Sequence, residues 1–227
     1  MRAVVGAQQA LVKNVSLATA VGRKLFPPVE AERIADVVAR DLHAIARNRR
    51  LAALALGYAL PAALEYGIAL PPGAGPKEPR PYCVLLHATS RADKLWPEPA
   101  WVQLGGELAR QGYALMLPWG DATERARSER IARALPTAVV PPALGILGIA
   151  GVLAGAQAVI GVDTGLTHLG AALGRPVVAL YCGTQPGLTG VYAGLGARVR
   201  NLGGADALPE VAEVLTALHQ IAGRDAK

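Results

Sequence analysis

Short apolar runs alternate with longer mixed stretches along the second part of the chain. The short runs predict strands, and the stretches between them predict helices. The predicted strands are residues 82–87, 113–117, 138–140, 158–162, 177–181 and 198–201, and the predicted helices are residues 97–111, 123–134, 144–154, 166–173 and 209–221. Repeated strand–helix units of this length predict an α/β fold with a Rossmann-like parallel sheet covered by helices on both faces.

The first part of the chain has a helical pattern without strands. Residues 1–25 and 28–57 predict two helices, which Pro27 and Pro28 separate. Acidic residues stand in the first turn of the second helix, as the helix dipole favours, and Gly57 ends it.

Prolines and glycines are concentrated between the two parts. Residues 59–81 contain six prolines and three glycines, which predicts an irregular linker rather than a long regular element. We therefore expect a helical segment over 1–58, the linker over 59–81, and a Rossmann-like domain over 82–227.

The segment A-V-I-G-V-D-T-G-L-T-H-L-G-A-A, residues 158–172, joins a predicted buried strand to a helix. Asp163 and Thr164 at the junction are good N-cap residues, and Gly165 lets the backbone approach a ligand closely. This junction lies at the carboxyl edge of a parallel sheet, so the first amides of the helix predict an anion site, for a phosphate above all. His168, one turn after Thr164, is expected on the same face. The alternative is a capped helix with a histidine satisfied within the protein.

Composition narrows the class of protein. The chain has 227 residues, of which 52% are hydrophobic, so it can bury a sizeable core and is not a disordered protein. Cys83 and Cys182 fall in apolar strand-like runs, which favours buried free thiols in a reducing compartment over a disulfide. The sequence has no Cys/His cluster of the metal-binding type and no recognisable signal peptide after Met1. It predicts neither a metal centre nor secretion.

Positive charge is concentrated at the N-terminal end. The net charge is +6, and residues 1–50 hold nine Lys or Arg against four Asp or Glu, a difference of five. A basic helical surface suits nucleic acid, an anionic membrane or an acidic substrate, and it also fits a simply solvated face. No aromatic platform or nucleic-acid-binding motif accompanies the charge, which argues against nucleic acid.

One uncharged stretch is long enough to suggest a membrane span. Residues 135–162 contain no charged side chain. Pro141, Pro142 and five glycines interrupt the stretch, however, and no aromatic belt flanks it. A buried helix followed by a central strand accounts for the same residues, and we expect that arrangement.

Three further stretches follow predicted strands. Residues 87–97 (H-A-T-S-R-A-D-K-L-W-P) supply two hydroxyls and Lys94, which would neutralise a phosphate or simply be solvated. Residues 117–120 (L-P-W-G) precede Glu124, whose carboxylate would accept the two hydroxyls of a ribose or stabilise its own helix. Residues 181–187 (Y-C-G-T-Q-P-G) form a turn whose amides would face a ligand. Neither G-x-G-x-x-G nor a Walker loop follows a strand, which argues against a dinucleotide dehydrogenase or an ATPase.

Four motifs together resemble one family. L-L-H-A-T-S-R-A-D-K-L-W-P-E, L-P-W-G with Glu124 after it, V-D-T-G-L-T-H-L-G-A-A-L-G-R-P and T-Q-P-G-L-T-G-V-Y are similar to the C-terminal half of the lipopolysaccharide heptosyltransferases of glycosyltransferase family 9. The D-T-G-L-T-H form resembles the first heptosyltransferase of the inner core more than the second. The resemblance covers residues 82–195 strongly and extends weakly back to residues 43–47 and 56–58.

The resemblance implies a GT-B architecture, in which two Rossmann-like domains face a cleft and the C-terminal one binds most of ADP-heptose. Residues 1–58 would then be a mainly helical remnant of the N-terminal, acceptor domain. The resemblance implies contacts with the diphosphate or heptose from the first motif, with the ribose from Glu124, and with the sugar and pyrophosphate from the third. The implied donor-binding residues are Thr89, Ser90, Lys94, Trp119, Gly120, Glu124, Asp163, Thr164, Gly165 and His168. It implies no obligatory metal and no cofactor, because ADP-heptose is a substrate.

One element of the family pattern does not appear. Members of the family begin with a strand and a glycine-rich turn resembling K-T-S-S-L-G-D, whose aspartate acts as general base on the Kdo hydroxyl of the acceptor. Nothing similar precedes Tyr82. If Met1 is the true start, the base and most of the acceptor site are missing, so the catalytic residues stay unassigned.

Two functions follow as expectations. As an enzyme, the chain would transfer L-glycero-D-manno-heptose from ADP-heptose to Kdo of the lipopolysaccharide inner core, with inversion. It would be cytoplasmic and peripheral to the inner membrane, with ADP-heptose, a Kdo-lipid A acceptor and an anionic membrane surface as partners and no nucleic acid. The alternative is a truncated, non-catalytic module that holds ADP or ADP-heptose without turnover.

Overall fold

The computed structural model of the protein describes residues 41–71, 73–76, 78–192 and 198–222. The chain divides into two compact units. One unit takes in Met1–Leu64 with Gly187–Thr189, and the other takes in Glu65–Pro186 with Gly190–Lys227. The domain boundaries drawn from the sequence stay a prediction.

The first unit contains helix α4 (Ala44–Leu56). Nδ1 of His43 accepts a hydrogen bond from the backbone N–H of Ile45 at 3.3 Å and so caps the helix. Gly57 ends it in the left-handed conformation, with φ 67°, as predicted. Residues 41–43 lie outside the helix, so the prediction of one helix over 28–57 is wrong there, because the His43 cap begins α4 at Ala44. The predicted helix over 1–25 and the start of the second lie outside the described residues.

The proline-rich segment has the irregular backbone that its composition predicts. The described residues between 59 and 81 form neither helix nor strand. Its start is tied to α4, because Nη2 of Arg49 donates hydrogen bonds to the carbonyl oxygens of Pro61 and Ala63 at 2.7 and 2.8 Å.

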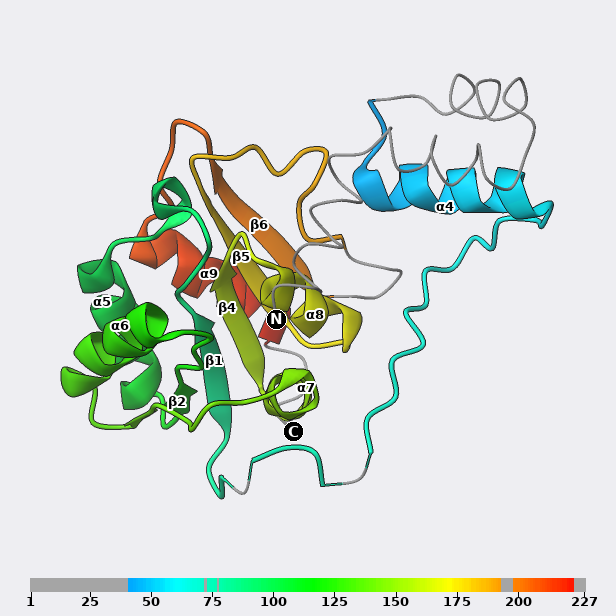
Figure 1. Cartoon of the computed structure of the whole chain (residues 1–227). Helices are drawn as coiled ribbons and strands as arrows, with labels where there is room; N and C mark the ends of the chain where they lie inside the picture. The colour runs from blue at the N-terminus through cyan, green and yellow to red at the C-terminus, as the bar shows by residue number, and fades with distance from the viewer. Residues whose placement is uncertain (1–40, 72, 77, 193–197, 223–227) are drawn as a thin grey trace. The chain divides into compact units, whose positions relative to one another are not determined.

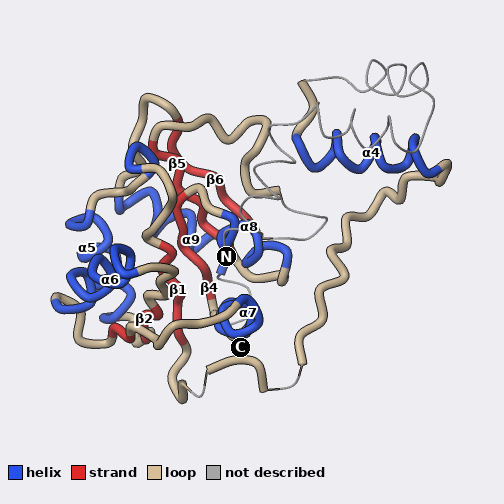
Figure 2. The backbone as a smooth tube through the Cα atoms, in the orientation of Figure 1, coloured by secondary structure: helices blue, strands red, loops and turns tan. Residues whose placement is uncertain are grey.

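The second unit is built on a parallel sheet of six strands (Figures 1 and 2). The strands are β1 (Tyr82–Leu86), β2 (Ala114–Met116), β3 (Ala138–Val139), β4 (Ala158–Val162), β5 (Val177–Cys182) and β6 (Val199–Gly204). Their order across the sheet is β3-β2-β1-β4-β5-β6, and every neighbouring pair is parallel. All six match predicted strands, and the order reverses direction between β1 and β4.

Helices cover both faces of this sheet (Figure 1). They are α5 (Glu98–Arg110), α6 (Ala122–Arg133), α7 (Ile146–Ala154), α8 (Gly165–Ala172) and α9 (Val211–Ala222). Side chains of α5, α6 and α9 pack on one face, and those of α7 and α8 pack on the other. Each helix lies where the sequence predicts one, whereas the short 3-10 helix η1 (Ala92–Lys94) was not predicted.

The strand side chains alternate between two hydrophobic layers. In β1, Cys83 and Leu85 join the layer under α5, α6 and α9, whereas Val84 and Leu86 join the layer under α7 and α8. Every residue of β1 is buried. A strand covered on both faces needs a continuous apolar run, which is the pattern from which these strands were predicted.

Two further expectations concern the core. Cys83 and Cys182 are buried free thiols, as predicted, and burial raises their pKa to about 12 and about 11. Residues 135–162 contain α7 and β4 rather than one long helix. Within the described part of the chain, no helix is both long and apolar enough to cross a membrane.

Candidate functional site

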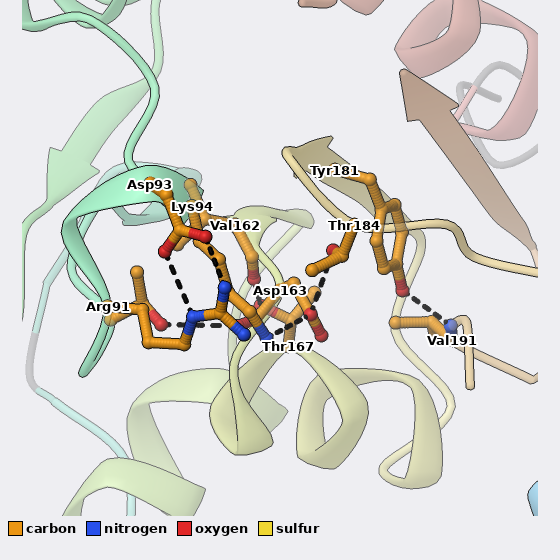
Figure 3. A network of polar contacts seen from close by, with 10 residues as sticks. Arg91, Asp93, Lys94, Val162, Asp163, Thr167, Tyr181, Thr184 and Val191 are labelled. Atoms are coloured by element: carbon orange, nitrogen blue, oxygen red, sulfur yellow. Dashed lines mark hydrogen bonds and ion pairs between the residues drawn. The ribbon is translucent and has the colours of Figure 1, made fainter. Parts of the chain in front are cut away.

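The loops after β1 and β4 meet where the strand order reverses. In open α/β sheets ligands bind at this point, beyond the carboxyl ends of the strands. Oγ1 of Thr89, after β1, donates a hydrogen bond to the backbone oxygen of Asp163, after β4, at 3.3 Å. Nζ of Lys94 lies 2.6 Å from Oδ2 of Asp163 (Figure 3). The two predicted phosphate-binding stretches therefore form one site.

The start of α8 is fixed by a buried threonine. Oγ1 of Thr167 donates to the carbonyl oxygen of Val162 at 2.7 Å, which holds the first turn of the helix on the end of β4 (Figure 3). Gly161 makes room for it, since a Cβ there would lie 2.3 Å from Oγ1 of Thr167. Thr164 occupies the N-cap position as predicted, but its side chain makes no capping hydrogen bond. The first amides of α8 thus have no side-chain cap, which suits binding of an anion.

Contacts within the β1–α5 loop, and between this loop and the end of β5, determine the position of Lys94. Arg91 and Asp93 form an exposed ion pair at the start of η1, and Asp93 raises the pKa of the Arg91 guanidinium. The loop also packs closely on the end of β5. Gly183 has φ +96°, and a Cβ there would lie 2.7 Å from the backbone oxygen of Asp93. Only a glycine lets the two loops approach this closely.

A third loop contributes Thr184, which follows β5. Its Oγ1 donates a hydrogen bond to Oδ2 of Asp163 at 3.2 Å (Figure 3). We call Thr89, Lys94, Asp163 and Thr184 the Asp163 cluster. Its members come from the loops after β1, β4 and β5, three strands that are neighbours in the sheet.

Trp119, Gly120, Asp121 and Glu124, which we call the Glu124 group, follow β2. Oδ1 of Asp121 accepts from the backbone N–H of Glu124 at 2.9 Å, and Oε2 of Glu124 accepts from that of Gly120 at 2.7 Å. Asp121 thus caps the start of α6, and the Glu124 carboxylate turns back to the residue before that cap, as in a variant of the capping box. Burial raises the pKa of the Glu124 carboxyl, and the Gly120 hydrogen bond opposes that rise. Glu124 therefore acts at the start of its own helix, which is the alternative to ribose binding that the sequence left open. One of its two carboxylate oxygens is used on the backbone N–H of Gly120.

A hollow lies beside Trp119. Its volume is about 380 Å³, and it is lined by Trp119, Arg125, Glu129 and residues 140–143. Nε1 of Trp119 donates to the carbonyl oxygen of Pro141 at 2.8 Å, and Cζ of Arg125 lies 5.4 Å from the centre of the Trp119 ring. The volume lies within the range of small-ligand pockets, and the flat ring and prolines suit an aromatic base.

The remaining predicted residues lie at the same edge of the sheet. Gly165 and His168 are half-buried in the first turns of α8, and Ser90 is exposed in the loop after β1. Among the described residues, no hydrogen bond or ion pair joins the Glu124 group to Lys94 or Asp163. The role of all ten predicted residues in binding a donor stays a prediction.

His87, directly after β1, is buried against α5 and α6. Its Nε2 lies 2.8 Å from Oγ of Ser128 in α6, and its ring stands edge-on to Trp101. Burial, assisted by the positive charge of Arg127, lowers the pKa of His87 to about 4. The imidazole is therefore neutral near pH 7, and it links the loop that carries Lys94 to the helix that carries Glu124.

Sequence reasoning missed three residues that shape this site. Thr184 lies in a stretch that was singled out for its amides, but its hydroxyl was not considered. Thr167 lies in the G-L-T-H segment, but nothing else in the sequence indicates that its hydroxyl bonds to the end of β4. Asp93 forms an ion pair with Arg91, two positions earlier. Aspartate favours turns, so the sequence contained a signal for a turn at this point. In the described ranges, no group of three or more His, Cys, Asp or Glu side chains is arranged to hold a metal ion.

The sequence and the fold both match known proteins. Lipopolysaccharide heptosyltransferase 1 of Pseudomonas aeruginosa is 45% identical over 161 residues, which are 70% of this chain and 45% of that protein. The protein of the same name from Escherichia coli K12 is 45% identical over 162 residues, or 68% of this chain and 49% of that protein. The chain thus spans about half the length of the curated relatives it matches.

Solved structures give the same result. E. coli heptosyltransferase WaaC with ADP matches with a TM-score of 0.70 and 39% identity, covering 81% of this chain and 58% of that one. WaaC with ADP-2-deoxy-2-fluoro heptose matches with a TM-score of 0.66 and 36% identity, covering 81% and 57%. Residues 29–223 match the sequence profile of glycosyltransferase family 9 (heptosyltransferase). The chain belongs to glycosyltransferase family 9, the heptosyltransferase family.

Proposed function

We propose that this chain binds ADP-heptose at the Asp163 cluster and serves the transfer of L-glycero-D-manno-heptose to Kdo of the lipopolysaccharide inner core. The observation that carries the proposal is the meeting of Lys94, Asp163 and the start of α8 at the reversal of strand order, with 2.6 Å between Nζ and Oδ2. Relatives named lipopolysaccharide heptosyltransferase 1, and WaaC structures with ADP and an ADP-heptose analogue, support the choice of donor.

Lys94 supplies positive charge for the diphosphate. An ammonium group has three donors, and one is used on Asp163. The other two have no partner in the described part of the chain, so they are available to phosphate oxygens. Negative charge grows on ADP as the glycosidic bond breaks, and Lys94 and the first amides of α8 stabilise it there.

The hollow beside Trp119 would take the adenine ring, and Glu124 would take the ribose. Glu124 uses Oε2 on the backbone of Gly120, and its other oxygen can accept from a ribose hydroxyl. In this proposal the nucleoside, the diphosphate and the sugar lie along the carboxyl edge of the sheet from β2 to β4. The donor is a substrate, and the proposal includes no cofactor.

Titration calorimetry of the chain with ADP and ADP-heptose tests donor binding, and a transfer assay with ADP-heptose and Kdo-lipid A tests catalysis. We expect both nucleotides to bind and heptose to appear on the acceptor. Binding without transfer would favour a donor-holding module, and failure to bind either nucleotide would contradict the proposal.

The acceptor is a lipid, so we also propose that the chain works at the cytoplasmic face of the inner membrane. The basic excess of residues 1–50 supports this place, since positive charge attracts anionic headgroups. Liposome co-sedimentation should require anionic lipid and weaken with added salt. Salt-independent binding to neutral liposomes would contradict this part of the proposal.

A further inference from the structure

The Asp163 carboxylate is held through one of its two oxygens. Oδ2 takes both the ion pair with Lys94, at 2.6 Å, and the hydrogen bond from Oγ1 of Thr184, at 3.2 Å (Figure 3). Oδ1 accepts no hydrogen bond from the part of the chain that the structure describes. The Asp163 side chain remains 15% exposed, so the carboxylate is not sealed in the protein interior.

Thr184 is well placed to fix the plane of this carboxylate. Rotation of an aspartate about its last side-chain bond is soft, and a single ammonium contact restrains it weakly because an ammonium is a compact point charge. A second donor from a different direction removes that freedom. Lys94 comes from the loop after β1 and Thr184 from the loop after β5, so the two donors reach Oδ2 from opposite sides of β4.

Two points of the chain near Thr184 in sequence are anchored by hydrogen bonds, Gly183 directly before it and Val191 seven residues after it. On one side, the N–H of Gly183 donates to the carbonyl oxygen of Gly204 at 3.0 Å. On the other, the N–H of Val191 is held by the hydroxyl of Tyr181 at 2.8 Å and by Oδ1 of Asn201 at 3.1 Å. Nδ2 of Asn201 also donates to the carbonyl oxygen of Val191 at 3.0 Å. The residue directly before Thr184 is therefore held against the end of β6.

We propose that Thr184 is a positioning residue of the donor site, which together with Lys94 holds Oδ2 of Asp163 so that Oδ1 faces a hydroxyl of the bound sugar. This inference rests on the proposed function, which supplies the ligand, ADP-heptose. Thr184 then favours binding of ADP-heptose, which carries a sugar, over binding of ADP, which does not. Lys94 serves both ligands through their common diphosphate.

A double-mutant cycle without ligand tests the contact itself. Thermal midpoints are measured for the full chain and for Thr184→Val, Asp163→Ala and the double variant. Thr184→Val keeps the size and branching of threonine but removes the donor. We expect it to lower the midpoint when Asp163 is present and to have a much smaller effect beside Asp163→Ala. Equal shifts in the two backgrounds, or no shift in either, would overturn the inference.

Calorimetry with two ligands tests the consequence. Thr184→Val should lose about 3- to 10-fold in affinity for ADP-heptose, because the Asp163 carboxylate keeps its charge but loses its fixed orientation, and should keep the affinity for ADP. Thr184→Ser, which restores a hydroxyl, should recover the ADP-heptose affinity. Equal losses for both ligands, or a serine variant that behaves like the valine variant, would show that Thr184 acts through loop packing. If the wild-type chain binds neither ligand, the proposed function fails, and the double-mutant cycle still decides whether Thr184 holds Asp163.

Discussion

The Asp163 cluster and the Glu124 group both lie at the carboxyl edge of the sheet, yet they are built in different ways. The cluster joins side chains from three loops, and its closest contact links residues 69 positions apart. In the Glu124 group the two capping hydrogen bonds span three and four positions. Local pairs satisfy the start of their own helix, whereas side chains gathered from distant loops leave donors and acceptors for a ligand. We therefore expect the cluster to dominate phosphate binding.

The largest effect is expected at Lys94. Lys94→Met keeps most of the side-chain length but removes the charge, so ADP affinity should fall by about 1.5–3 kcal/mol, as for hydrogen bonds to charged groups. Glu124→Gln keeps an acceptor for Gly120 and should cost about 1 kcal/mol or less. Titration calorimetry measures both losses. Arg133→Met, in the last turn of α6, is the matched control and should bind ADP normally.

The comparison would break if the order of these two losses were reversed. A larger loss in Glu124→Gln would mean that the ribose contact outweighs the diphosphate contact. Unchanged affinity in Lys94→Met would remove the cluster from phosphate binding altogether.

A second prediction concerns His87, the link between the two regions. Its pKa falls from 6.5 to about 4 on folding, because of burial and the charges of Arg127 and Arg130, which Glu98 partly offsets. Between these values the unfolded chain binds a proton that the folded chain does not, so stability is full above pH 6.5 and is lost as the pH falls toward 4. From pH 7 to pH 5 this histidine alone should cost about 2 kcal/mol of unfolding free energy.

Urea unfolding at pH 7, 6 and 5 measures that loss. His87→Gln cannot take up the proton, so its unfolding free energy should fall less between pH 7 and pH 5 than that of the wild type. His219→Gln changes an exposed histidine of α9 and should keep the wild-type pH dependence. If His87→Gln also keeps it, His87 is not the buried neutral group described above.

The elements of the fold could be predicted because their causes are local. A strand buried on both faces needs an unbroken apolar run, and the bounds of β4, Ala158–Val162, match the prediction at both ends. The error in the helix predicted over 28–57 is also instructive. Histidine is not a common N-cap, so nothing in the residue pattern predicts that a helix begins after His43.

The site was predictable only in part, because its decisive contacts are not local. The position of Thr164 at the start of α8 follows from its residue type and its neighbours. The contact between Thr184 and Asp163 depends on β5 lying next to β4, and the approach of η1 depends on Gly183 accepting φ +96°. Glu124 is the opposite case, because its contact is local. A carboxylate in the first turn of a helix can accept from the backbone just before that helix, as Glu124 does from Gly120.

The smallest predicted effect is at Asp121, and it tests whether the Glu124 group is structural in the first place. Asp121→Ala removes the side-chain cap of α6 and should cost about 1 kcal/mol of unfolding free energy, which urea unfolding measures. Asp121→Asn keeps an oxygen acceptor and should stay close to the wild type. Neither change should alter ADP affinity more than about twofold, because weak capping bonds lie outside the diphosphate contact. An ADP loss in Asp121→Ala as large as that in Lys94→Met would mean that this local cap orders the ligand site, and the distinction between the two regions would no longer hold.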